Sequence, residues 1–476
     1  MNRWRDGLHL ALIIAICVVV IGLLVLVKPG YFTNMEYLGG LLLLEALAAA
    51  IWKYDQRFFP VLILVFLLAG TNVPVAGMWN AVRWVVLGAG ALAGMAIYLK
   101  NYPFSAQLIH WIALSCVVAA ATSAEVSSFP KQPLLKALSL FLLFLYGSFG
   151  ARLAIAGREK KFFANLLWGC EALIYFTALQ YFILHREFFG NPNSLGAVMG
   201  VVAVPLMLWG ISVAGNVRIQ RRRVFALILS LILLFTSYAR ASIVAATVSC
   251  ILFCLLLRNY RALIRGLAIA FAIAIVVPYV VPLPNSPAAA TTLRSRFLFK
   301  GKEQAGALGS RKPVWDTTIS SIEQHPWFGT GFGTTLSAFD TDANQVANFS
   351  STIVTTREHG NSYLAITEGV GLVGVVPFLS LIILTIVNIA RVLRYLFHTR
   401  DPNFAAVPIA LVLMAGLVHA LFEDWLFAVG YYTCVFFWAF GFMLVDLVPL
   451  ASQVPDGCDL PQMHIPQETV LVPSVL

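Results

Sequence analysis

The 476-residue chain has few charged residues. Only 11% are Asp, Glu, Lys or Arg, against roughly 25% in an ordinary soluble domain. Hydrophobic residues make up 60% of the chain. These proportions exclude a soluble globular protein, an intrinsically disordered chain and a collagen-like chain. They predict an all-α polytopic membrane protein.

Cysteine is also scarce, with seven residues and no spacing typical of a zinc site or a disulfide framework. Six of the seven lie inside apolar runs, where a thiol behaves as a small hydrophobe. We therefore expect no cofactor and no metal. The net charge of +10 does not indicate nucleic acid as a partner, because the basic residues form short clusters between apolar runs.

About fourteen apolar runs are candidates for transmembrane helices, at about 20 residues per span. They lie near residues 8–27, 37–52, 58–74, 79–99, 104–122, 134–156, 162–184, 194–214, 223–238, 240–257, 262–283, 362–388, 404–421 and 427–448. Arg3 and Arg5 before the first run resemble a signal peptide, but Leu8 to Val27 is long enough to span and no small-residue cleavage site follows. We interpret it as the first transmembrane helix.

The orientation follows from Lys and Arg in the short loops, since the positive-inside rule counts these residues. With the N-terminus in the cytoplasm, cytoplasmic positions hold 18 Lys or Arg and the short outer loops hold four: Lys28, Lys131, Arg186 and Arg240. This asymmetry predicts cytoplasmic termini in a bacterial inner membrane protein whose polar clusters face the periplasm.

The chain is expected to fall into four parts: transmembrane helices over 1–283, a large periplasmic loop over 284–361, transmembrane helices over 362–448 and a disordered tail over 449–476. Within the loop, Pro313 can begin a helix. Trp315, Ile319 and Ile322 give it an apolar stripe, and His325 and Pro326 end it.

Two arginines stand at outer ends of spans. Arg186 precedes Asn191 and Asn193, next to a helix start at Asn193 or Ser194 whose amides suit an anion. Arg240 lies in a tight turn between two apolar runs, where a guanidinium is costly without a partner. Both fit a pyrophosphate, and both equally fit lipid headgroups.

A third polar cluster, Arg357, Glu358, His359, Gly360 and Asn361, precedes the span that begins near residue 362. His359 is the best candidate for a general base, since its ordinary pKa lies nearest neutrality. Glu358 is the substitute. Glu368, farther along the helix, faces a cavity or pairs with an arginine, and Gly371, Gly374 and Pro377 predict close packing and a kink.

Two weaker patterns have competing interpretations. Gly329, Gly331 and Gly333 form either a plain turn or a cradle of amides for an anion. Glu423 and Asp424, with His419 nearby, form either a solvated loop end or a divalent-metal site, and we favour the loop end.

In their order along the chain, these motifs resemble the O-antigen ligase and O-antigen polymerase superfamily of bacterial membrane glycosyltransferases. The resemblance spans about residues 160–390. It rests on Arg186 with Phe-Phe-Gly-Asn-Pro-Asn, on Ser-Tyr-Ala-Arg-Ala-Ser at 237–242, on Arg311, Trp315, His325, Pro326 and the three glycines of the loop, and on Asn361, Ser362, Tyr363 and Leu364 leading to Glu368, Gly371, Leu372 and Gly374.

The resemblance implies a metal-independent, inverting transfer at the periplasmic face from an undecaprenyl-pyrophosphate-linked glycan. The acceptor is the lipid A-core sugar in ligases and a second lipid-linked glycan in polymerases. Arg186 and Arg240 would bind the pyrophosphate and His359 would activate the acceptor hydroxyl, while Asn191, Asn193, Arg311, Asn361 and Glu368 would contact substrate. In ligases the histidine stands directly before the Asn or Ser that precedes the Tyr-Leu stretch, and here Gly360 takes that place. The alternatives to His359 as the base are therefore Glu358 or no residue at all.

A polysaccharide lipid flippase or transporter is the alternative from another class. It predicts polar sites at the membrane midplane. Glu45 and Glu171 are the deep acids that favour it.

Overall fold

The computed structural model describes residues 58–71, 76–102, 106–186, 188–280, 311–334 and 358–452. The predicted spans at 8–27 and 37–52, and the tail from residue 453, lie outside these residues. Every regular secondary-structure element assigned in the described part is a helix, and these residues contain no β-strand.

Seven helices among the described residues are long and apolar enough to cross a membrane, by length and composition. They are Trp79–Asn101, Leu108–Val126, Lys131–Ile155, Glu159–Ile183, Pro192–Ser212, Tyr260–Val277 and Ser362–Thr399. Four shorter apolar helices accompany them: Phe58–Ala69, Arg240–Leu256, Ala406–Ala420 and Tyr432–Val448. The chain is therefore a multi-pass membrane protein, and the total of fourteen spans stays a prediction.

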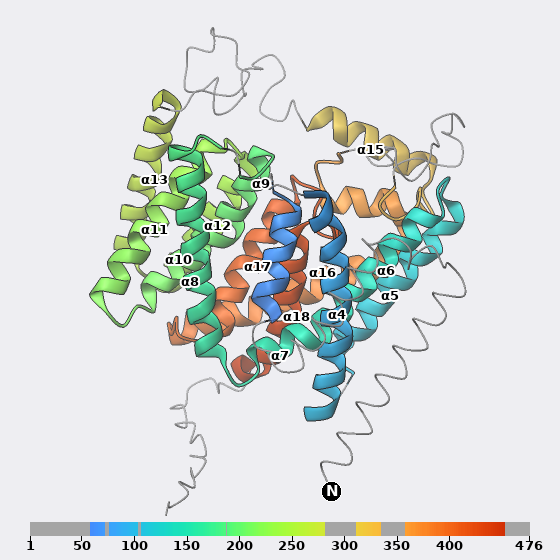
Figure 1. Cartoon of the computed structure of the whole chain (residues 1–476), viewed down its shortest axis with the longest axis horizontal. Coiled ribbons are helices and arrows are strands. Elements are labelled where there is room, and N and C mark those ends of the chain that lie inside the picture. The colour runs from blue at the N-terminus through green and yellow to red at the C-terminus, as the bar shows by residue number, and fades with distance from the viewer. Residues whose placement is uncertain are drawn as a thin grey trace, which may run out of the picture.

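The bundle has a central group and two flanks (Figure 1). The centre is α16 (Ser362–Thr399), α17 (Ala406–Ala420) and α18 (Tyr432–Ser452). One flank holds α4 (Ala76–Asn101), α5 (Leu108–Thr122), a 3-10 turn (Ser123–Val126), α6 (Lys131–Tyr146), a π-helical turn (Gly147–Ala151) and α7 (Arg152–Ile155). The other holds α8 (Glu159–Ala178), α9 (Pro192–Ala197), α10 (Val204–Ser212), α11 (Val217–Thr236), α12 (Arg240–Leu256) and α13 (Tyr260–Val280), with π-helical turns at Leu179–Ile183 and Val198–Ala203.

The core lies where α17 and α18 are enclosed by the other helices. Almost every side chain of α17 is buried, and Trp438 is the largest fully buried side chain among the residues that the structure describes. In contrast, α13 exposes most of its apolar side chains, as expected for a helix at the lipid boundary.

Helix α15 (Lys312–Gln324) lies across one end of the bundle, next to α16 (Figure 1). The predicted helix is confirmed, with Pro313 in its first turn and its end at His325. The predicted stripe is partly wrong. Thr318 is the buried residue and Ile319 is exposed, because the packed face follows Trp315, Thr318 and Ile322.

Three predicted helix boundaries are wrong. Helix α9 begins at Pro192, because Asn191 and not Asn193 or Ser194 caps it. Helix α11 begins at Val217 instead of 223, because the side chain of Asn216 accepts the N–H of Arg218 at 2.7 Å. Helix α16 continues to Thr399, well past 388. Basic residues counted as loop residues therefore lie on the first turns of α11 and the last turns of α16.

Buried charges away from α15 are paired. Arg152 forms two hydrogen bonds with Asp446, at 2.6 and 2.5 Å. Glu171 lies 2.6 Å from Arg222 and 3.6 Å from Arg223. Glu171 is therefore held in an ion pair between α8 and α11. This pairing favours a structural role for Glu171 over a role in a transport path.

Candidate active site

His359 lies between two carboxylates, just before α16. Its main-chain N–H donates to Oδ2 of Asp424 at 2.9 Å, and its Nδ1 lies 3.0 Å from the same oxygen. On the other side of the ring, Nε2 lies 3.0 Å from Oε2 of Glu368. His359 is 8% exposed and Glu368 is 1% exposed, so the ring is fixed on both sides inside the protein.

These contacts determine how the site titrates. Burial acts to lower the pKa of the His359 imidazole, but its hydrogen bonds to Asp424 and Glu368, with the charges of both carboxylates, raise it above the ordinary value of 6.5. Burial acts to raise the pKa of Asp424, and the hydrogen bonds from His359 outweigh burial and lower it. The geometry therefore favours the imidazolium form paired with ionised Asp424.

Arg311 lies next to this cluster, at the N-cap of α15. Its guanidinium binds Glu358 at 2.6 Å through Nη1 and Glu423 through Nη2. Glu423 also accepts a long hydrogen bond of 3.4 Å from Nδ2 of Asn193. The loop after α17, the start of α9 and the start of α15 thus meet around one guanidinium.

Arg240, the first residue of α12, is half-buried and lies close enough to Arg311 for the two positive charges to repel each other. A buried contact fixes α12 in this place. Trp425 donates to Nδ1 of His419 at 2.7 Å, so Nε2 carries the proton and faces Oγ of Ser242 at 3.0 Å. This chain of contacts ties Arg240 to the loop that carries Asp424.

Gly360 stands where the resembled ligases have histidine, and the structure gives a physical reason for glycine there. Its φ is +62°, a left-handed conformation that favours glycine. A Cβ at this position would lie 2.9 Å from Nη1 of Arg311. The carbonyl of Gly360 accepts from Nε1 of Trp315 at 3.0 Å, so the turn that directs His359 inward is also held by α15.

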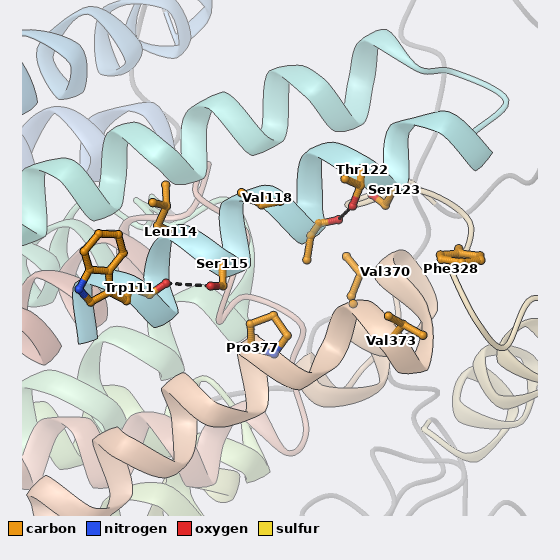
Figure 2. A pocket seen from close by; sticks show the side chains of 12 residues that line it. Trp111, Leu114, Ser115, Val118, Thr122, Ser123, Phe328, Val370, Val373 and Pro377 are labelled. Atoms are coloured by element: carbon orange, nitrogen blue, oxygen red, sulfur yellow. Dashed lines mark hydrogen bonds between the residues drawn. The ribbon is translucent and has the colours of Figure 1, made fainter. Parts of the chain in front are cut away.

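A cavity of about 370 Å³ lies between α5 and α16, close to this cluster. Its walls are mostly apolar, and Figure 2 shows Trp111 and Leu114 of α5 at one end and Phe328, Val370 and Val373 at the other. Val370 follows Glu368 by two residues on α16. The short segment around Val370 therefore separates the ionic cluster from the cavity.

Several predicted site residues come together. Glu358, His359, Arg311, Glu368 and Asn193 are joined by the contacts above, and Arg240 is near enough to Arg311 for their charges to interact. Arg186 does not share this network: it is exposed in the loop before α9 and forms none of the ion pairs among the described residues. Its role in binding pyrophosphate stays a prediction.

The two predicted substrate-binding asparagines at helix starts act as caps. Oδ1 of Asn191 accepts the N–H of Asn193 at 2.8 Å, and Oδ1 of Asn361 accepts those of Tyr363 and Leu364 at 2.8 and 3.1 Å. Both satisfy main-chain donors that a helix start leaves open. Substrate contact by either residue stays a prediction.

Sequence reasoning missed Glu423 and Asp424 as parts of the site. The favoured interpretation, a solvated loop end, is wrong because both carboxylates are partly buried and paired, with Arg311 and with His359. The metal-site alternative is wrong too, since both nitrogens of His419 are engaged by Trp425 and Ser242. Two adjacent acids at a span end, in a chain with only 22 Asp and Glu, were the available signal.

The glycine turn is not an anion cradle. The main-chain N–H groups of Thr330 and Gly331 donate to carbonyls of α16 at 2.9 Å each, and that of Phe332 donates to Oγ of Ser123 at 2.8 Å. An amide that already donates cannot bind an anion without losing that bond. The turn fastens α15 to the ends of α5 and α16.

Comparison with known proteins supports the resemblance. Residues 225–379 match the family model described as O-antigen ligase, which confirms the resemblance to the O-antigen ligase and polymerase superfamily. The matched stretch runs from α11 into α16 and holds Arg240, Arg311, His359 and Glu368. Arg186 and Asp424 lie outside it. No curated protein matches the chain.

Proposed function

We propose that this chain, whose residues 225–379 match the O-antigen ligase family, transfers a glycan from an undecaprenyl-pyrophosphate-linked donor to a hydroxyl of an acceptor sugar. The observation that carries the proposal is one cluster. His359 makes buried contacts with Asp424 and Glu368, Arg311 binds the neighbouring Glu358 and Glu423, and Arg240 is near enough to Arg311 for their charges to interact. The family match supports a glycan-transfer role in polysaccharide synthesis and implies lipid-linked glycan substrates.

The arginines act on the leaving group. When the bond between the sugar anomeric carbon and the pyrophosphate oxygen breaks, negative charge builds on the pyrophosphate. Fixed guanidinium groups stabilise that charge without rearranging at the moment of reaction. Arg311 already binds Glu358, whose side chain is 61% exposed, so the pyrophosphate takes the place of this exposed carboxylate. Because Arg240 and Arg311 supply the positive charge, we propose a metal-independent reaction.

His359 acts on the acceptor. Asp424 holds Nδ1, which fixes the tautomer and leaves Nε2 as the proton-accepting atom of the neutral ring. Nε2 faces Glu368 in this structure, so Glu368 keeps the ring in place until the acceptor hydroxyl reaches Nε2 and gives its proton to His359. Glu358 is the alternative base. A single displacement, with the acceptor oxygen attacking opposite the departing pyrophosphate, inverts the anomeric centre.

The cluster lies at the end of the bundle that carries α15 (Figure 1). The distribution of Lys and Arg in the loops assigns this end to the outer face. We therefore place the transfer at the periplasmic face of the inner membrane, with both termini in the cytoplasm.

The experiment is transfer of a defined undecaprenyl-pyrophosphate glycan by the purified full chain. Lipid A-core or a second lipid-linked glycan is offered as acceptor, and a chelator is present in a parallel series. Product on lipid A-core identifies a ligase, and longer lipid-linked chains identify a polymerase. Absence of transfer to either acceptor overturns the proposal, as does full activity of Arg240→Ala.

A further inference from the structure

Helix α16 is interrupted at Gly371, whose φ and ψ are 70° and −179°, a conformation essentially restricted to glycine. In an unbroken helix the N–H groups of Leu372 and Val373 would donate to the carbonyls of Glu368 and Gly369. Both of these hydrogen bonds are replaced here by others.

The replacements come from residues 326–334, which we name the strap. The carbonyls of Glu368 and Gly369 accept from the N–H groups of Thr330 and Gly331, both at 2.9 Å. The N–H groups of Leu372 and Val373 donate to the carbonyls of Pro326 and Trp327, at 2.7 and 3.2 Å. Two helical hydrogen bonds are thus exchanged for four with the strap, and the break leaves none of these main-chain groups unsatisfied.

Glycine is required on both sides of this contact. Gly329 has a φ of +71°, and a Cβ there would collide with the carbonyl oxygen of Glu368. A Cβ on Gly371 would collide with the main chain of Trp327. The two backbones therefore touch directly, and a single methyl group at either position would separate them.

The strap is itself held in place at its far end. Ser123 Oγ accepts the N–H of Phe332 at 2.8 Å, Lys136 donates to the carbonyl of Gly333, and Ser127 Oγ lies 3.3 Å from Thr334 Oγ1. At its near end the strap continues from α15. The break in α16 is consequently fixed relative to α5, α6 and α15.

We propose that the strap is a positioning element of the transfer site, holding Glu368 and thereby the ring of His359 in place. This inference rests on the proposed function. The residue whose carbonyl Thr330 binds is Glu368 itself, and its buried carboxylate lies 3.0 Å from Nε2 of His359. Residues 362–370 form a short helical piece fixed at its other end by Ser362, whose Oγ donates to the carbonyl of Glu423 at 2.6 Å. Displacing the strap frees one end of this piece.

The test is a double-mutant cycle on the transfer rate, with Gly371→Ala, Glu368→Gln and the double variant. A displacement of about 1 Å at a catalytic group costs on the order of 100-fold, so Gly371→Ala is expected to lower kcat at least about tenfold. If the strap acts through Glu368, the double variant loses no more than the worse single variant. The proposal is overturned if the loss of kcat in the double variant is the product of the losses in the two single variants. It is also overturned if kcat is unchanged in Gly371→Ala.

Gly157→Ala is the matched control. Gly157 also has a positive φ, +65°, but no atom lies within 4 Å of where its Cβ would be. Gly157→Ala therefore places an alanine at a positive φ without a collision, and its kcat is expected to match that of the wild type. If Gly371→Ala fails to elute as a monodisperse species, Thr330→Val takes its place in the cycle. That variant removes the hydroxyl contacts with Thr334 and Glu368, at 3.1 and 3.4 Å, and keeps the main chain.

A second measurement separates this inference from the proposed function. The pH dependence of His359 modification by diethyl pyrocarbonate, followed by mass spectrometry of its peptide, gives the titration midpoint without any turnover. The charged groups around the ring are Glu368 of α16, Asp424 of the loop after α17, and Arg311 with its partners Glu358 and Glu423.

Loss of the Glu368 contact removes support for the imidazolium, so the midpoint is expected to fall in Gly371→Ala and Thr330→Val and to stay unchanged in Gly157→Ala. An unchanged midpoint in both strap variants overturns the inference. If the wild type transfers no glycan, the proposed function fails, and the midpoints still decide whether the strap positions Glu368.

Discussion

Asp424 holds His359 twice with one oxygen: Oδ2 lies 2.9 Å from the main-chain nitrogen and 3.0 Å from Nδ1. The carboxylate therefore fixes both the path of the backbone and the direction of the ring. Because Asp424 lies on the loop after α17 and His359 precedes α16, this pair joins two residues that lie 65 positions apart in the chain.

Removing either member of this pair should slow transfer. His359→Ala is expected to lower kcat by about 10²- to 10⁴-fold, the usual contribution of a general base. Asp424→Asn is expected to lower kcat less, because the ring remains present but is free to turn. Initial rates with the lipid-linked donor measure both. The control is His398→Ala, an exposed histidine near the far end of α16, which should keep full activity; a similar loss there would contradict a specific role for His359.

Loss of the Arg240 guanidinium should slow the departure of the pyrophosphate leaving group. Arg240→Ala is expected to lower kcat by about 10²- to 10³-fold, as for other fixed groups that stabilise developing charge. Arg240→Lys should recover part of the activity, because a lysine keeps the charge but lacks the planar fork. Arg391→Ala, an exposed arginine near the far end of α16, is the matched control. A lysine variant as active as the wild type would argue against bidentate binding of pyrophosphate.

The rate should depend on pH through His359. A base must be neutral to accept a proton, and the pKa of His359 is raised above 6.5 by Asp424 and Glu368 despite the opposing effect of burial. Transfer is therefore expected to rise with pH through a midpoint above 6.5. In Asp424→Asn this midpoint should fall, because a neutral amide supports the imidazolium less than a carboxylate does. A rate that is constant from pH 6 to 9 would point to Glu358 or to no base.

The same shift has a consequence for stability. A histidine whose pKa is higher in the folded chain stabilises the fold below its unfolded pKa, and this contribution is lost as pH rises through the folded value. The wild type should therefore have a higher thermal midpoint than His359→Gln at low pH. The difference between the two midpoints should become smaller as pH rises above 6.5 toward alkaline values. Paired thermal melts of the two proteins in detergent measure this difference, and a gap that widens with pH would contradict it.

The Arg152–Asp446 pair should matter for stability and not for transfer. Asp446→Ala leaves the guanidinium of Arg152, whose side chain is 8% exposed, without its carboxylate, at an expected cost of about 3 kcal/mol. Helix α7 lies at the opposite end of the bundle from α15 (Figure 1), so kcat at a temperature below unfolding should be unchanged. A reduced kcat in a fully folded sample would mean that this pair is coupled to the site.

The amino-acid sequence by itself determined the class of protein and most of its helices. Apolar runs bounded by charges identify membrane helices because the bilayer requires length and hydrophobicity from each segment on its own. Pro313 and His325 likewise determined where α15 begins and ends, since helix termini follow local chemistry. The family resemblance rested on motifs that are continuous in sequence, and Arg240, Arg311 and His359 lie inside the matched stretch.

Only the tertiary structure decided which groups act together. The sequence suggested a loop end for Asp424, but the fold brings this residue to His359. It suggested a plain turn for the glycines at 329, 331 and 333, but the strap that carries them packs against the break in α16. The physical reason is that ion pairs and main-chain hydrogen bonds between distant segments leave no periodic pattern in sequence. A helix start is a property of a few neighbouring residues, whereas the environment of His359 depends on segments brought together by packing.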